Sequence, residues 1–176
     1  RLNISAHGWN QEYFCKNTGN SKEQCENIKS HILSLAIKGK IHKINYVLQK
    51  GKNESDFYAL LESVKNLNIV VDVLNLLVFP GQEDAAKLQY SFAEIEQFVN
   101  EYWSIDKSID YENPYSLPSK RLVLTNGCVI NLKVNQLNKQ EVFLSCKNCL
   151  YKESCTEGIK AIRLTNDGLI QPCLFR

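Results

Sequence analysis

The segment Ile69–Val78 constrains the fold more than any other part of the sequence. It reads IVVDVLNLLV and is almost continuously apolar. A strand with one wet face would alternate apolar and polar residues, whereas a strand buried on both faces is apolar throughout. The segment therefore predicts a central strand of a sheet that is covered on both sides.

Strand-like and helix-like segments alternate before and after this strand. Strands are expected at Arg1–Ser5 and Ile41–Leu48, and helices at 10–17, 21–38, 54–66 and 91–103. This α/β order favours a parallel sheet joined by right-handed crossovers. Three such strands cannot close a barrel, which takes about eight. We therefore expect a sheet that is open on one side.

The pattern changes after about Asp106. The stretch Tyr111–Lys120 contains two prolines and resembles a linker, and Arg121–Lys133 predicts a hairpin with Asn126-Gly127 at its turn. A second hairpin is expected over 161–173, with its turn at 166–168. These changes predict two domains, 1–108 and 109–176.

Composition limits the classes of function. Apolar residues make up 44% of the chain and the formal net charge is +2. No strongly basic face for nucleic acid is expected, nor a membrane span, which needs about 18 apolar residues. Without a secretory leader, the seven cysteines indicate a reducing, cytoplasmic setting. Because the chain begins at Arg1 and lacks methionine, we expect it to be part of a longer protein.

Four cysteines lie close to the end of the chain. Their spacing is Cys146-x2-Cys149-x5-Cys155-x17-Cys173, and the last one falls on the return strand of the second hairpin. Four thiolates suit either a tetrahedral zinc ion or an iron–sulfur cluster. Spacing alone does not choose between them, and a buried group of free thiols is a third reading.

The second hairpin carries the most specific pattern. RLTNDGLIQPCLF, at 163–175, resembles the end of the MoaA family of radical S-adenosylmethionine enzymes, C-x-x-C-N-R-L-R-L-T-x-D-G-x-L-x-x-C-L. Two upstream segments agree in order: Arg1–Ser5 resembles R-V-N-V-S, and Lys43–Asn53 resembles K-I-N-x-V-x-x-x-G-x-N. The three matches span nearly the whole chain.

This resemblance implies a fold and an activity. The fold is half of a partial (β/α) TIM-like barrel, 1–108, followed by a small β-hairpin cysteine-rich cap, 109–176, of the twitch or SPASM kind. The family begins molybdenum-cofactor synthesis with a lyase-type cyclisation of GTP, a small-molecule nucleotide substrate. The cap would carry an auxiliary [4Fe-4S] cluster.

The resemblance also implies roles for single residues. Ser5 and Leu77 would contact S-adenosylmethionine, Lys43 would face the anionic part of the substrate, and Arg163 would lie beside the substrate. The ligands of the auxiliary cluster would be Cys146, Cys149, Cys155 and Cys173. Ser5, Lys43 and Arg163 also have a plain reading as exposed strand residues, and Cys128 is expected to pack in the core.

Several positions depart from the family. Ala161 stands where the family has the first of two arginines, Asn75 replaces a common acidic residue, and the longer gap after Cys149 contains Cys155. If Cys155 is a ligand, all four irons are held by thiolate. These departures favour a MoaA-like relative that acts on another substrate.

The C-x3-C-x2-C loop that binds the radical-generating cluster is absent from the sequence. We therefore expect an inactive C-terminal portion whose partner is the N-terminal half of the same enzyme. The alternative is a non-catalytic module with a structural zinc ion in a four-cysteine ribbon.

Overall fold

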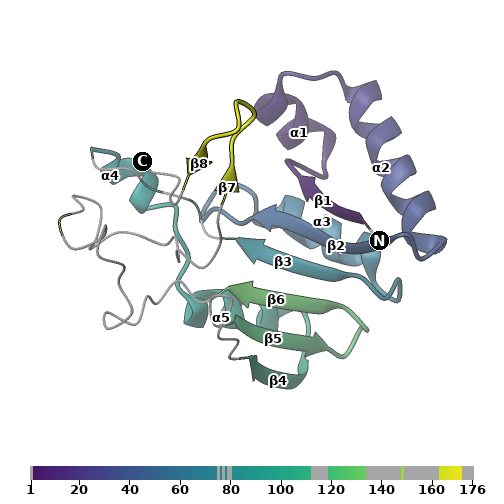
Figure 1. Cartoon of the computed structure of the whole chain (residues 1–176). Coiled ribbons are helices and arrows are strands. Elements are labelled where there is room, and N and C mark those ends of the chain that lie inside the picture. Colours follow the sequence, from purple (N-terminus) through teal and green to yellow (C-terminus); the bar gives the residue numbers. More distant parts are fainter. Residues whose placement is uncertain are drawn as a thin grey trace.

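The computed structural model describes residues 2–74, 76, 78, 81–111, 119–133, 148 and 163–171, with only the backbone of Lys133 and Arg163. Within these residues the chain forms a mixed α/β structure. A six-stranded sheet is covered by helices, and a two-stranded hairpin lies apart from it (Figure 1).

The large sheet has the strand order β1-β2-β3-β6-β5-β4. Strands β1, β2, β3 and β6 run parallel, while β5 is antiparallel to both of its neighbours. The strands are β1 (Leu2–Ala6), β2 (Ile41–Val47), β3 (Val70–Leu74), β4 (Ile105–Tyr111), β5 (Ser119–Leu124) and β6 (Val129–Lys133). The separate hairpin pairs β7 (Arg163–Leu164) with β8 (Ile170–Gln171).

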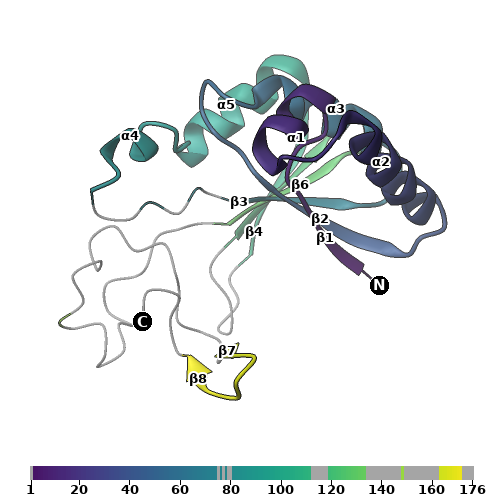
Figure 2. The same ribbon diagram turned by 90° about the horizontal axis from the view of Figure 1, so that it is seen from above.

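The large helices lie on one side of this sheet. Figure 2, seen from above, shows α1, α2, α3 and α5 together on that side and the β7–β8 hairpin on the opposite side. The helices are α1 (Gln11–Thr18), α2 (Lys22–Ile37), α3 (Glu54–Val64), α4 (Glu83–Ala86) and α5 (Phe92–Tyr102). One face of the sheet is therefore packed against helices, and the other faces the side of the hairpin.

Two helices start where their sequences contain a capping box. Ser21 caps α2 by accepting from the Gln24 backbone, and Gln24 returns a side-chain contact to the Ser21 backbone. Ser91 and Glu94 make the same pair of contacts at α5. Each box gives partners to backbone N–H groups that a helix start leaves unpaired.

The core fills the layer between sheet and helices. Strand residues Ile44, Val71 and Ile130 are fully buried there, as are Phe57 and Leu60 of α3. The alternation of strand residues and the helical spacing of α3 bring these side chains together. Cys128 is also buried, and its Sγ lies 3.2 Å from the Leu61 carbonyl oxygen. The expectation that Cys128 packs in the core is confirmed.

The structure differs from the sequence expectations in two strands. β3 covers only Val70–Leu74 rather than the whole of 69–78. Strand β4 was not expected, because its sequence IDKSIDY is mostly polar; it is an edge strand whose side chains are largely exposed. The predicted domain boundary at 108 lies within β4, and the division into two domains stays a prediction.

The α/β class, the parallel pairing of the first three strands and the 121–133 hairpin are confirmed. In that hairpin Gly127 adopts a φ of 84°, a conformation that glycine adopts without strain. Within the part of the chain that the structure describes, no helix is long and apolar enough to cross a membrane.

Candidate functional site

The two faces of the sheet differ in chemistry, as β2 shows. Ile44 and Tyr46 are buried toward the helices, while Lys43, Asn45 and Val47 alternate with them and are only partly buried. Since successive side chains of a strand point to opposite faces, Lys43 and Asn45 lie on the face opposite helices α1, α2, α3 and α5.

Polar side chains continue across this second face at one level of the sheet. Ser5 of β1 is paired with Asn45, Asn45 with Asp72, Asp72 with Asn131, and Asn131 with Arg121. We call these five residues the polar row. Residues paired across strands point to the same face, so the row runs over five adjacent strands.

Asp72 is the centre of the row. It is 1% exposed, and its carboxylate lies 2.9 Å from Lys43 Nζ. The Asn131 side-chain amide donates to the other carboxylate oxygen at 3.1 Å. A buried carboxylate needs such partners, because burial of an unpaired charge is strongly unfavourable. Lys43 and Asn131 therefore stabilise Asp72 from the two strands beside it.

Three atoms of the row are buried without a hydrogen-bond partner among the described residues: Asn45 Oδ1, Asn131 Oδ1 and Arg121 Nε. The Arg121 guanidinium stacks over the Tyr111 ring at 4.7 Å, with Nη1 3.5 Å from the Tyr111 hydroxyl. Buried polar groups in proteins are nearly always hydrogen-bonded. These two acceptors and one donor of the polar row are therefore positions at which a ligand could form hydrogen bonds.

Two of the residues expected from the sequence lie at this site. Ser5 is an exposed member of the row, and Lys43 is the ion-pair partner of Asp72. Arg163 belongs to β7, and its side chain is not described. Leu77 and the cysteines Cys146, Cys149, Cys155 and Cys173 lie outside the described residues.

Four residues of the row were not predicted from the sequence: Asn45, Asp72, Asn131 and Arg121. A signal was present for two of them. Asp72 interrupts the apolar run of β3, and Asn131 interrupts Val-Ile-Asn-Leu in β6. A polar residue inside an apolar strand has to find partners on its own face. The register that unites these residues across strands is not visible in a single sequence.

A second buried carboxylate organises the start of α1. Asp56 is 1% exposed and accepts from the Trp9 backbone at 2.8 Å and from the Tyr46 hydroxyl at 2.6 Å. The Asn10 backbone also donates to it. Burial, followed by the hydrogen bond to Asp56, raises the pKa of Tyr46 far above its ordinary value. Because its acceptor sites are filled, we assign Asp56 a structural role.

The turn before α1 needs glycine. A Cβ on Gly8 would lie 2.7 Å from Phe14 Cα, closer than atoms can pack. The backbone at position 8 can therefore approach α1 this closely only because glycine has no side chain.

Asn53, the last residue of the motif that begins at Lys43, closes the loop after β2. Its Oδ1 accepts from the Gln49 backbone at 2.7 Å, and its Nδ2 donates to the Val47 carbonyl at 2.9 Å. The residue is 1% exposed, so this asparagine holds the end of the strand that carries Lys43.

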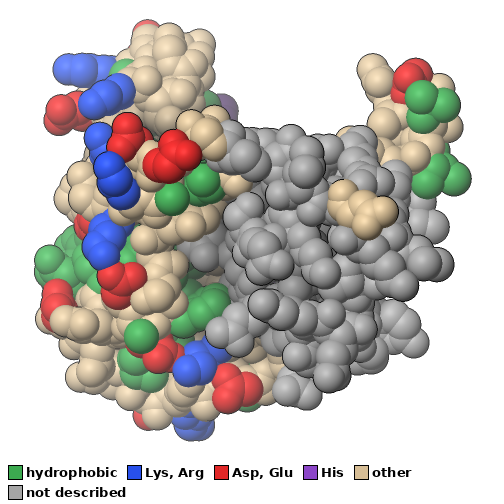
Figure 3. Space-filling view, turned by 90° about the vertical axis from the view of Figure 1, so that its left-hand side faces the viewer, with side chains coloured by type: hydrophobic (Ala, Val, Ile, Leu, Met, Phe, Trp, Pro, Cys, Tyr) green, Lys and Arg blue, Asp and Glu red, His purple; other side chains and the backbone are tan. Residues whose placement is uncertain are grey.

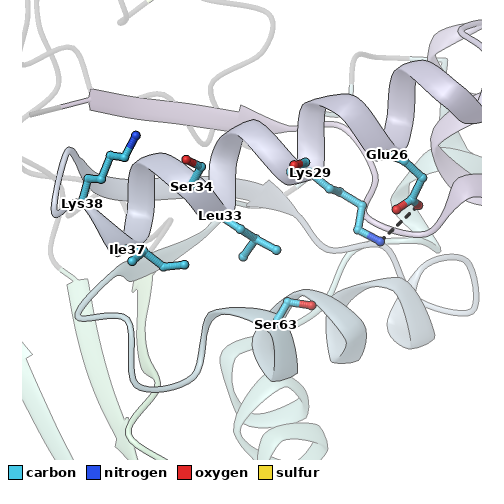
Figure 4. A pocket seen from close by; sticks show the side chains of 8 residues that line it. Glu26, Lys29, Leu33, Ser34, Ile37, Lys38 and Ser63 are labelled. Carbon is cyan, nitrogen blue, oxygen red and sulfur yellow. Dashed lines mark hydrogen bonds and ion pairs between the residues drawn. The ribbon is translucent and has the colours of Figure 1, made fainter.

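An open groove of about 600 Å³ lies between α2 and α3 (Figure 4). Leu33 and Ile37 form its apolar part, and Glu26 and Lys29 are ion-paired at 3.4 Å at one end. The groove belongs to the helical layer, whereas the polar row lies on the other face of the sheet. It contains none of the residues expected from the sequence.

The face drawn in Figure 3 shows basic and acidic side chains close together among the described residues. Ion pairs such as Lys50–Glu94 and Lys120–Glu96 account for several of the charges of the helical layer. Within the described ranges, no three histidine, cysteine or acidic side chains are grouped so that they could hold a metal ion. The four terminal cysteines lie outside those ranges.

Comparisons with known proteins add no family to this description. No protein-family model matches the chain, and no curated protein is significantly similar to it.

Proposed function

We propose that the chain is the C-terminal portion of a MoaA-like radical S-adenosylmethionine enzyme that holds an auxiliary [4Fe-4S] cluster. The observation that carries the proposal is the polar row on the sheet face opposite the large helices. The row includes Ser5 and adjoins Lys43. In a partial barrel this face would line the interior, where such enzymes bind ligands. The ordered match of three sequence segments supports the same reading.

The donor set at the end of the chain suits an iron–sulfur cluster. Cys146, Cys149, Cys155 and Cys173 supply sulfur only, and cysteine thiolates are the ligands of such clusters. When bound, the cluster would supply electron transfer or an anchoring site for a substrate. Leu77 and Ser5 would contact S-adenosylmethionine, Lys43 and Arg163 would lie beside the substrate, and the enzyme would work in the cytoplasm.

The test is anaerobic reconstitution of the purified chain with iron and sulfide. We expect broad absorbance in the violet and about four irons and four sulfides per chain. Cys146→Ser, Cys149→Ser and Cys173→Ser should abolish that absorbance. Cys15→Ser is the matched control, because Cys15 belongs to α1, and it should leave the absorbance unchanged.

Two results would count against the proposal. A colourless, air-stable protein with one zinc ion per chain would favour a structural zinc ribbon, and a chain without bound metal would remove both metal readings. Cys155→Ser separates three ligands from four: loss of the absorbance would make Cys155 a ligand.

A further inference from the structure

Asp72 of the polar row already balances the charge of the adjoining Lys43. Lys43 Nζ lies 2.9 Å from the Asp72 carboxylate, and these side chains are 24% and 2% exposed. Opposite charges at this distance attract strongly in a partly buried setting. A ligand anion at Lys43 would have to compete with Asp72, so the middle of the row does not select for an anion.

The orientation of the Asn131 amide follows from its neighbour. Its Nδ2 donates to Asp72 at 3.1 Å, and the reverse orientation would put two oxygens together. Oδ1 is therefore the atom left over, and it is buried without a partner among the described residues. It is an acceptor that needs a donor.

The Arg121 guanidinium is fixed in a similar way. Its Cζ lies 4.7 Å from the centre of the Tyr111 ring, and this contact restrains the group. In that position Nε is a buried donor with no partner in the described part of the chain. It needs an acceptor.

Arg121 and Asn131 are directly paired across β5 and β6, and directly paired residues have Cβ atoms about 5 Å apart. One donor beside one acceptor is the complement of an amide, whose C=O and N–H are themselves an acceptor and a donor. We propose that the polar row binds an uncharged amide edge, as in a carboxamide or lactam, through Arg121 Nε and Asn131 Oδ1. The inference rests on the proposed function only for taking this face as the site of a small-molecule substrate.

Asn45 supports the amide over an anion. Its buried Oδ1 is a further acceptor without a described partner, on the other side of Asp72. A carboxylate brings only acceptors at neutral pH, and most oxygens of a phosphate are acceptors too, so either would place oxygen against Asn45 or Asn131. A ligand with N–H groups offers donors to both.

The experiment uses a matched pair of probes on the purified chain. Succinamide and succinate share a carbon skeleton and differ in amide against carboxylate, and pyrophosphate serves as the polyanion. NMR follows the Arg121 Nε–H signal and the side-chain amides of Asn45 and Asn131 during titration. We expect saturable shifts of the Arg121 and Asn131 signals with succinamide and none with succinate or pyrophosphate.

Two variants of one strand sharpen the result. Arg121→Lys keeps the charge but removes Nε–H, and it should weaken succinamide binding about tenfold, as the loss of a charged hydrogen bond does. Lys120→Arg is the matched control, because Lys120 points to the helices and pairs with Glu96 at 2.7 Å; it should bind as the parent chain does.

Three outcomes would overturn the inference: stronger binding of succinate or pyrophosphate, no shift with succinamide up to its solubility limit, or full binding by Arg121→Lys. The titration is run on both the metal-free and the reconstituted chain. A chain that forms the cluster but ignores succinamide would contradict only this inference, whereas one that binds succinamide but no cluster would contradict only the proposed function.

Discussion

The two faces of the sheet share the same strands and the same backbone hydrogen bonds, yet at one level of the strands their side chains differ in polarity. Toward the helices lie Ile44, Val71, Ile130 and Leu122, all fully buried and apolar. On the other face, at the next level of the same strands, lies the polar row. A burial-driven fold needs only one apolar face per sheet, so a row of polar residues on the other face is compatible with the same core. The comparison predicts that the two faces respond differently to mutation.

The largest effect is expected at the helix-covered face. Ile130→Ala removes a fully buried side chain and should lower the free energy of unfolding by about 3 kcal/mol, through lost burial and a residual cavity. Urea denaturation measures it. The neighbouring Asn131→Ala is the control on the opposite face, with an expected loss of about 1 kcal/mol. Equal losses at the two positions would break the comparison.

An intermediate effect is expected from the ion pair of the polar face. Lys43→Met removes the cation that lies 2.9 Å from the Asp72 carboxylate, which is 1% exposed, and should lower the free energy of unfolding by about 2 kcal/mol. The double variant Lys43→Met/Asp72→Asn should regain most of that loss, because it removes the buried negative charge together with the lysine. A double variant that is less stable than Lys43→Met would show that the charge of Asp72 is not what makes the loss of Lys43 unfavourable.

A smaller effect is expected at Tyr46, a residue of the helix-covered face whose hydroxyl donates a buried hydrogen bond to Asp56. Tyr46→Phe removes the 2.6 Å donor to that carboxylate, which keeps its two backbone donors. We expect a loss of about 1 kcal/mol in urea denaturation. Tyr13→Phe is the control, since the Tyr13 hydroxyl contacts Asn53 rather than Asp56. A loss as large as that of Ile130→Ala would show that the apolar face depends on its polar contact.

The smallest effect concerns acid stability of the helical layer. Hydrogen bonds from Lys50 and Ser91 lower the pKa of Glu94 from 4.5 to about 2. A folded-state pKa below the unfolded one contributes stability above about pH 4.5, and this contribution is lost as the pH falls toward 2. Thermal melts of the parent chain and Glu94→Gln should therefore converge over that range. A constant difference between them would exclude this linkage.

The helices and strands that could be predicted from the sequence are those with a regular pattern of apolar residues. Helices α2, α3 and α5 lie within the ranges expected at 21–38, 54–66 and 91–103, and β3 lies within the apolar run 69–78. Strand β4 was not predicted because it is a polar edge strand. Such a strand forms by pairing with its neighbour and carries no apolar pattern that would identify it. Of the site, only Ser5 and Lys43 were named from the sequence, through a family resemblance. Asn45, Asp72 and Asn131 could not be joined without the register of three strands.

The polar row draws on chain positions from Ser5 to Asn131, so it exists only when five strands are in register. A one-residue slip of any strand would turn its contribution to the opposite side. Pairings between such distant positions form slowly and late in folding. A molecule that binds the row would thus bind only the fully folded sheet. By mass action it would shift the equilibrium from partly folded chains toward the folded state.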